Sequence, residues 1–181
     1  METDKQLEIA CAEGNLTQLK SILSDPQYQY DSINFVDDFG RTPFTTACHA
    51  SHTQIVKELL KCGRLDISKQ IDRKDKEGCT PLWTACFSDS VDIIKLLIAT
   101  GLPLDTTCKC KNSQILHPMN VLEVSKTKGL TRITALLERY IQNPASLISE
   151  LSTPLSIYIF LLYFSIPLSS LSPLLPKFIE S

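Results

Sequence analysis

A Thr-Pro pair recurs in this chain inside matching surroundings, and this internal repeat limits the folds open to the chain more than any other feature. The pair stands at Thr42-Pro43 and again at Thr80-Pro81, 38 residues later. The stretches 37–48 and 75–86 around the two pairs align without a gap. A repeat of this length is typical of solenoids, in which every unit packs against its neighbours. We therefore expect a stack of similar units.

Each unit is predicted to be a pair of helices. A threonine before a proline can cap a helix by accepting a hydrogen bond from an amide of the first turn, and the proline suits the first helical position. A second helix is indicated by apolar residues at helical spacing, which are Ile55, Val56, Leu59 and Leu60 in one copy and Ile93, Ile94, Leu97 and Ile98 in the next. Such spacing places these side chains on one buried stripe.

The two central copies resemble the ankyrin repeat. Residues 37–101 carry the pattern D-x-x-G-x-T-P, then an Ala-Cys pair of small residues, then the second apolar stripe, which is similar to the family's T-P-L-H-x-A core. Residues 7–23 and 120–137 are weaker copies, as expected of end repeats that have a neighbour on one side only. The resemblance implies an all-α, ankyrin-type helix-turn-helix solenoid of about four repeats.

The copies here are longer than those of the family. They lie 37, 38 and about 40 residues apart, whereas the family's usual period is ~33 residues. Most of the excess falls between Gly63 and Asp75 and between Gly101 and Asn120, so we place it in the region of the projecting turns. The family's histidine after Thr-Pro-Leu is replaced by a threonine in the second copy and a tryptophan in the third.

The resemblance also implies a function, which is binding another protein through the turns and the exposed face of the first helix of each repeat. Carried over position by position, the partner-binding residues are Asp38, Phe39, Arg41 and His49 in the second copy and Lys76, Glu77, Phe87 and Ser88 in the third. Phe39 and Phe87 stand out because aromatic anchors dominate many interfaces. The alternative is that either ring packs against its own repeat or an inserted loop.

Catalysis, cofactors and metals are not predicted. The chain lacks a nucleophile constellation, a phosphate-cradling loop and a paired-carboxylate motif. Cys108 and Cys110 with His117 could form half of a zinc site, but their spacing matches no common finger and a fourth ligand is missing. A small thiol- or metal-dependent activity at these cysteines is the least favoured hypothesis.

Charge and the N-terminus are typical of a cytoplasmic protein. The formal net charge is -2, from 18 basic and 20 acidic residues, which gives no reason to expect nucleic acid as a partner. The charged N-terminus lacks the apolar region of a secretory signal, so we expect the seven cysteines to be thiols. Cys11, Cys48 and Cys86 occupy equivalent positions in three copies and are expected to be buried.

Composition changes abruptly near Asn143. Of the 38 charged residues, 35 lie within residues 1–149, and residues 151–176 contain none. We therefore divide the chain into an ankyrin-repeat domain, residues 1–143, and an apolar Ser/Pro/Leu-rich tail, residues 144–181. The tail is long enough for a transmembrane anchor, but it could also fold back on the last repeat or be an alternative C-terminus.

Two functions from different classes follow from these observations. The leading hypothesis is an adaptor or scaffold that is a monomer and binds an unidentified protein, either free in the cytoplasm or tethered to a membrane by its C-terminus. The alternative is the truncated ankyrin portion of a larger multidomain enzyme or regulator.

Overall fold

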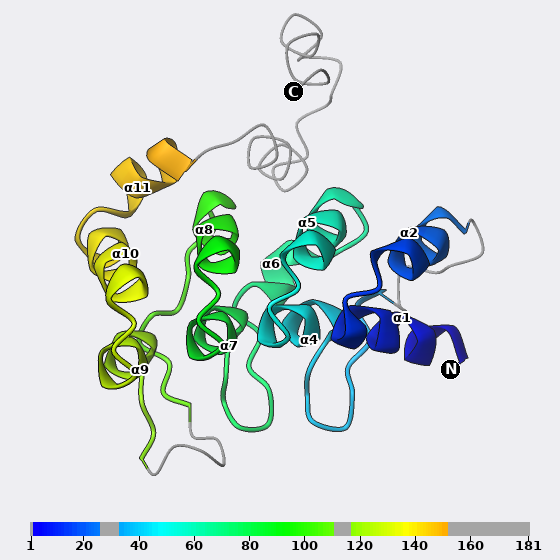
Figure 1. Ribbon diagram of the computed structural model, residues 1–181, viewed down its shortest axis with the longest axis horizontal. Coiled ribbons are helices and arrows are strands. Elements are labelled where there is room, and N and C mark those ends of the chain that lie inside the picture. Colours follow the sequence, from blue (N-terminus) through cyan, green and yellow to red (C-terminus); the bar gives the residue numbers. More distant parts are fainter. Residues whose placement is uncertain (1, 26–32, 111–116, 152–181) are drawn as a thin grey trace, which may run out of the picture.

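The computed structural model describes residues 2–25, 33–110 and 117–151, and in these residues the chain is an all-α solenoid. Its helices are α1 (Glu2–Glu13), α2 (Leu16–Ser24), α4 (Pro43–His49), α5 (Thr53–Lys61), α6 (Ile67–Gln70), α7 (Pro81–Phe87), α8 (Val91–Ala99), α9 (Val121–Thr127), α10 (Thr131–Gln142) and α11 (Pro144–Leu151). Figure 1 shows α1, α4, α7 and α9 in one row and α2, α5, α8 and α10 in a second row. The predicted stack of about four helix-turn-helix repeats is confirmed.

The first helix of each later repeat begins at a side-chain cap. Thr42 Oγ1 accepts a hydrogen bond from the Thr45 amide at 3.3 Å, and Thr80 Oγ1 accepts one from the Trp83 amide at 3.2 Å. In the fourth repeat, Asn120 takes the place of the threonine. Its side chain accepts from the Glu123 amide at 2.9 Å while the Glu123 carboxylate accepts from the Asn120 amide at 2.7 Å. This capping box explains why a helix starts there without a Thr-Pro pair.

The residue three places after each capping threonine behaves differently in the two central repeats. In the second repeat, the hydroxyl groups of Thr45 and Thr42 lie 3.0 Å apart, so a side-chain hydrogen bond back to the cap is kept. In the third repeat, the Trp83 indole Nε1 donates instead to the Met119 carbonyl at 2.8 Å. Trp83 therefore connects α7 to the segment that leads into α9.

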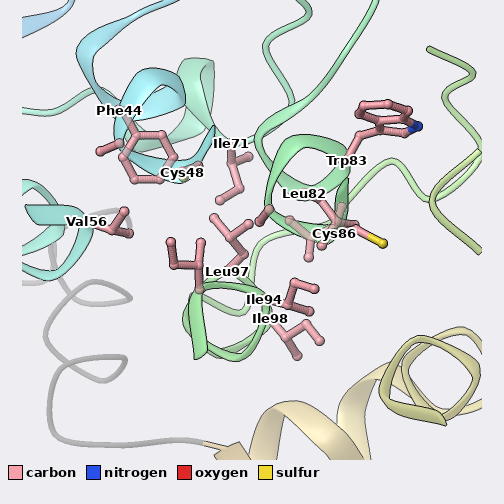
Figure 2. Close-up of a cluster of buried hydrophobic side chains, with 14 of the residues drawn as sticks. Phe44, Cys48, Val56, Ile71, Leu82, Trp83, Cys86, Ile94, Leu97 and Ile98 are labelled. Carbon is pink, nitrogen blue, oxygen red and sulfur yellow. The ribbon is translucent and has the colours of Figure 1, made fainter. Parts of the chain in front are cut away.

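The core lies between the two rows of helices. Ala47, Cys48, Ala85 and Cys86 are fully buried, because side chains of this size let α4 and α7 lie close together. Ile94, Leu97 and Ile98 of α8 are also fully buried, and Figure 2 shows Leu97 on the side of α8 nearer Val56 and Ile98 on the opposite side. Each large apolar side chain buried in this way contributes about 1.5–3 kcal/mol to folding, so the second apolar stripe supplies much of the stability.

Three buried cysteines lie in this core at equivalent places of the first three repeats. Burial raises the pKa of the Cys11 and Cys86 thiols to about 12 and raises that of Cys48 further. A thiol with such a pKa stays protonated at neutral pH and is a poor nucleophile. The prediction that these residues are buried is confirmed.

The first insertion adds a short helix to the core and does not lengthen a projecting turn. Ile67 and Ile71, at the two ends of α6, are buried. The Asn34 side chain holds the segment: its Nδ2 donates to the Arg64 carbonyl at 3.3 Å, and its Oδ1 accepts from the Asp66 amide at 3.1 Å. Our placement of these extra residues in the turn region is therefore wrong for the first insertion.

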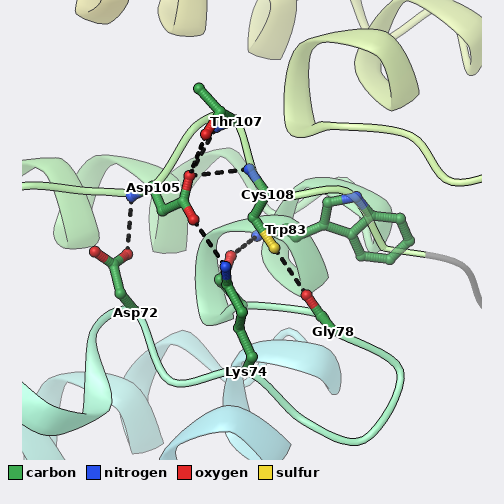
Figure 3. A network of polar contacts seen from close by, with 8 residues as sticks. Asp72, Lys74, Gly78, Trp83, Asp105, Thr107 and Cys108 are labelled. Carbon is green, nitrogen blue, oxygen red and sulfur yellow. Dashed lines mark hydrogen bonds and ion pairs between the residues drawn. The ribbon is translucent and has the colours of Figure 1, made fainter.

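The second insertion is tied to the third repeat by polar contacts (Figure 3). The Asp105 amide donates to Asp72 Oδ1 at 2.9 Å, and the Asp105 carboxylate pairs with Lys74 Nζ at 3.1 Å. Hydrogen bonds, the largest from the Thr107 side chain, lower the pKa of Asp105, whereas burial raises the pKa of Asp72. Cys110 and Met119 then exchange two backbone hydrogen bonds of 3.1 Å, which form an isolated antiparallel bridge.

The projecting turns of the second and third repeats touch each other. The Lys76 amide donates to the Phe39 carbonyl at 2.9 Å. Gly40 (φ +80°) and Gly78 (φ +82°) both have a left-handed backbone, which costs other residues about 1–2 kcal/mol. The two sites differ in the space around them. A Cβ on Gly40 would lie 3.0 Å from the Lys76 nitrogen, whereas a Cβ on Gly78 would lie 3.5 Å from the Lys109 oxygen.

We expect Gly40→Ala to lower the free energy of unfolding by about 2–3 kcal/mol and Gly78→Ala by about 1–2 kcal/mol. Both variants carry the backbone penalty, but only Gly40→Ala also pushes the two turns apart. Urea denaturation followed by far-UV circular dichroism measures both. Equal losses would show that the contact between the turns adds nothing to stability.

The C-terminal part of the described chain continues the fold beyond Asn143. Helix α11 packs against α8 and α10, and its Leu147 is buried. The predicted boundary at residue 143 falls between α10 and α11, while residues 152–181 of the predicted tail lie outside the described residues. Within residues 2–25, 33–110 and 117–151, none of the helices is long and apolar enough to cross a membrane.

Candidate partner-binding surface

Five of the eight predicted binding residues lie together on the two projecting turns. This turn group consists of Asp38, Phe39, Arg41, Lys76 and Glu77. The hydrogen bond between Lys76 and Phe39 joins its two halves. Asp38, Phe39, Lys76 and Glu77 are exposed, and Arg41 is half-buried.

Acidic side chains hold both turns in shape. Asp37 Oδ1 accepts from the Phe39 amide at 2.8 Å and from the Arg41 amide at 2.7 Å. Asp75 repeats this arrangement in the third repeat, accepting from the Glu77 amide at 2.9 Å and from the Cys79 amide at 2.8 Å. The turns are therefore ordered before any partner arrives.

Phe39 is the most exposed large apolar side chain among the described residues. Its exposed fraction is 64 %, compared with 47 % for Ile141, 40 % for Ile9 and 36 % for Val36. The Arg41 guanidinium lies over the ring, 4.7 Å from its centroid, and Arg41 Nε donates to Asp37 Oδ2 at 3.0 Å. A cation held in this way positions the ring without covering it.

The other three predicted residues form a second group at the C-terminal ends of α4 and α7. This helix-end group consists of His49, Phe87 and Ser88. Ser88 Oγ donates to the His49 carbonyl at 2.7 Å, which joins the two helices. His49 is exposed, whereas Ser88 and Phe87 are half-buried.

Phe87 has neighbours that Phe39 lacks. Its ring stacks on Trp83 with the centroids 5.3 Å apart and the planes 8° from parallel. The Lys128 ammonium lies 3.9 Å from the centre of the Phe87 ring and donates to the Phe87 carbonyl. Phe87 is thus packed within the solenoid, while Phe39 leaves most of its surface to solvent.

Sequence reasoning missed Lys128 and the role of Trp83 at this surface. Aligning the cap Asn120 with Thr80 places Lys128 at the position of Ser88, so the fourth copy carried a signal for it. Trp83 and Phe87 are four residues apart in one helix, a spacing at which side chains meet. Both contacts could therefore have been predicted from the sequence, given the expected helix boundaries.

The proposed zinc residues do not gather around one point. Cys110 forms a disulfide with Cys79, and His117 is exposed. Among the described residues, the possible ligands that lie within 4.8 Å of one another are Asp75, Glu77 and Cys79. A sulfur engaged in a disulfide is not the thiolate that binds zinc.

The disulfide corrects an expectation about redox state. The Cα atoms of Cys79 and Cys110 are 4.9 Å apart, within the roughly 4.4–6.8 Å that disulfides span. The other five cysteines are thiols. The expectation of seven thiols is therefore wrong for this pair, which the sequence places 31 residues apart.

The fold belongs to the class of helical repeat solenoids, in which helix pairs are stacked and joined by projecting turns. A model of ankyrin repeats matches residues 7–109 with three copies, which is more than half of the 181 residues. This chain belongs to the ankyrin-repeat family. Among curated proteins, none matches it. Ankyrin repeats are generally protein-protein interaction modules, so a protein partner is the function that the family carries.

Proposed function

We propose that this protein is a non-enzymatic adaptor that binds a partner protein through the turn group and the adjoining helix-end group. The observation that carries the proposal is the 64 % exposure of Phe39, in a turn held by Asp37 and joined to the next turn. A partner that buries this solvent-exposed aromatic ring gains binding free energy from the large apolar area removed from water. The neighbouring charges supply a polar rim around it.

Preorganisation supports this role. A partner that binds a loop must offset the entropy of ordering it, and this cost is small where the loop is already fixed. The carboxylates of Asp37 and Asp75 fix both turns, and Arg41 fixes the Phe39 ring. The turn group therefore resembles an interface anchor with an arginine and an aromatic ring side by side.

We expect Phe39→Ala to weaken partner binding at least about tenfold while leaving the fold intact. The full chain would be used as bait in a cell lysate, and captured proteins would be quantified against the wild type. Ile141→Ala is the matched control, because Ile141 is 47 % exposed but lies at the end of α10, away from the turns. Circular dichroism checks that both variants keep their helices.

The pattern of loss decides the proposal. A partner that is lost with Phe39→Ala and kept with Ile141→Ala supports the turn group. A partner that is kept by Phe39→Ala would refute the surface. Phe87→Ala is less informative, because removing this ring also removes its stacking on Trp83.

The location of the protein is a separate proposal. We propose a cytoplasmic monomer, with the uncharged residues 151–176 as a tether to a membrane. The support is the length and composition of that stretch. Carbonate washing of a membrane fraction tests it, because a tethered protein stays in the pellet and an untethered one is released.

A further inference from the structure

We propose that Lys128 is a specificity-determining residue of the partner surface, where its ammonium pairs with an aspartate or glutamate carboxylate of the partner protein. The inference rests on the proposed function, because it names the chemistry of the partner at the helix-end group. Lys128 directly follows α9, is exposed, and occupies the place in the fourth repeat that Ser88 occupies in the third.

The ammonium of Lys128 is held in place by the third repeat. It donates a hydrogen bond to the Phe87 carbonyl and lies 3.9 Å from the centre of the Phe87 ring. The ring is itself held, because it stacks on Trp83. An ammonium carries three N–H donors, and the Phe87 carbonyl takes one of them. The charge is therefore positioned at the surface with donors left for a partner.

The charge of Lys128 has no counter-ion in the described part of the chain, whereas two other cations of the fourth repeat are paired. Lys126 Nζ lies 2.9 Å from the Glu138 carboxylate. Arg139 bonds to the Glu150 carboxylate. A partner carboxylate at Lys128 would meet a cation that is already ordered, so the entropy cost of forming the pair is small.

The contact between the repeats does not by itself require a charged side chain. The Ala12, His49 and Phe87 carbonyls stand at equivalent places, 37 and 38 residues apart. The Ala12 carbonyl lies 3.0 Å from His52 Nε2, and the His49 carbonyl accepts from Ser88 Oγ at 2.7 Å. An imidazole and a hydroxyl group thus make this contact at the first two junctions. An exposed cation near a helix C-terminus adds only weakly to stability, so stacking of the repeats does not explain the lysine.

Phe87 acts on a partner through Lys128. The Phe87 ring is half-buried and in contact with both Trp83 and the Lys128 ammonium. An aromatic face attracts a cation and so fixes its position. At this place the surface therefore presents a charge more than an aromatic face, and Phe87 is a positioning residue.

A carboxylate fits this cation better than a phosphate group. A lysine ammonium is a single point charge, whereas phosphate groups on proteins are commonly bound by clusters of arginines. The helix-end group, His49, Phe87 and Ser88, contains no arginine. Asp89, the residue after Ser88, is exposed and acidic, and it repels a phosphate more strongly than a singly charged carboxylate.

The test compares full chains that differ in the charge at this place. Lysate proteins captured by the wild type are quantified for Lys128→Gln, Lys128→Arg, Lys126→Gln and Phe39→Ala, at equal amounts of folded protein judged by far-UV circular dichroism. We expect Lys128→Gln to weaken capture about tenfold and Lys128→Arg to restore it, because the guanidinium keeps the charge. Lys126→Gln is the matched control, since it removes a neighbouring exposed charge that is paired with Glu138.

Salt and a phosphatase identify the group on the partner. Salt screens an exposed ion pair, so we expect capture by the wild type to fall as salt is raised, and capture by Lys128→Gln to fall less. Treating the lysate with a phosphatase should leave capture unchanged, because the proposed group is a carboxylate.

The variants separate this inference from the proposed function. A partner that is released by both Phe39→Ala and Lys128→Gln, and restored by Lys128→Arg, supports the inference. A partner released by Phe39→Ala but kept by Lys128→Gln overturns the inference alone, and a partner kept by both variants overturns the turn group as well. Equal losses with Lys128→Gln and Lys128→Arg, a loss that does not depend on salt, or a loss after phosphatase treatment would also overturn the inference.

Discussion

Trp83→Ala should lower the free energy of unfolding by about 3–5 kcal/mol, the largest loss expected of any single change in this chain. Trp83 is 1 % exposed, and its removal leaves a cavity between α7 and the segment at Met119 that leads into α9. The change also strips the stacking partner from Phe87 and the donor from the Met119 carbonyl. Urea denaturation followed by far-UV circular dichroism measures the loss without the indole signal.

A conservative variant separates packing from hydrogen bonding. Trp83→Phe keeps an aromatic ring on α7 and removes the donor to Met119, so we expect a smaller loss of about 1–2 kcal/mol. A Trp83→Ala protein as stable as the wild type would contradict the packing described for this repeat. Equal losses in the two variants would assign the whole effect to the indole donor.

Removing the disulfide should lower the free energy of unfolding by about 3–4 kcal/mol in an oxidising buffer. The bond closes a loop with a sequence separation of 31 residues, which contains α7 and α8. Opening it gives the unfolded chain more conformations, so Cys79→Ser/Cys110→Ser is expected to unfold at lower urea than the oxidised wild type. The measurement is a pair of urea titrations, repeated with a reductant.

The reductant provides the control for this second prediction. Reduced wild type and the double serine variant should unfold at nearly the same urea concentration, since both lack the bond. Cys62→Ser should stay within about 0.5 kcal/mol of wild type under both conditions. A double variant as stable as the oxidised wild type would show that the bond adds nothing to stability.

Much of the fold follows from local signals in the sequence. The Thr-Pro pairs predict where α4 and α7 begin, and the caps at Thr42 and Thr80 form as expected. The apolar stripes of α5 and α8 are buried where their spacing placed them. These features depend on residues within one turn of each other, so a linear sequence carries them.

Features that depend on distant contacts could not be predicted in the same way. Helix α6 exists because Ile67 and Ile71 are buried and because Asn34, some thirty residues earlier, bonds to its backbone. The disulfide needs an insertion to bring Cys110 back to Cys79. Neither contact leaves a periodic pattern in the chain.

The candidate surface shows the same division. The family pattern places Phe39 and Phe87 at comparable sites, yet one ring is mostly exposed and the other is half-buried. The difference comes from Trp83, which stands one helical turn before Phe87, and from Lys128 in the next repeat. Residue type alone therefore did not predict which of the two phenylalanine rings is the more exposed.

Asn34 and Asp72 stand 38 residues apart at equivalent places of their repeats, and each binds a backbone amide of the next insertion. The junction between the second and third repeats and that between the third and fourth differ in the side-chain group that becomes hydrated when the repeats separate. Parting the second repeat from the third hydrates a neutral amide, whereas parting the third from the fourth hydrates a carboxylate whose charge burial disfavours. Hydration of that charge offsets part of the lost contacts. The contact of Asp72 with the second insertion therefore includes the cost of burying a charge, which the contact of Asn34 with the first insertion does not.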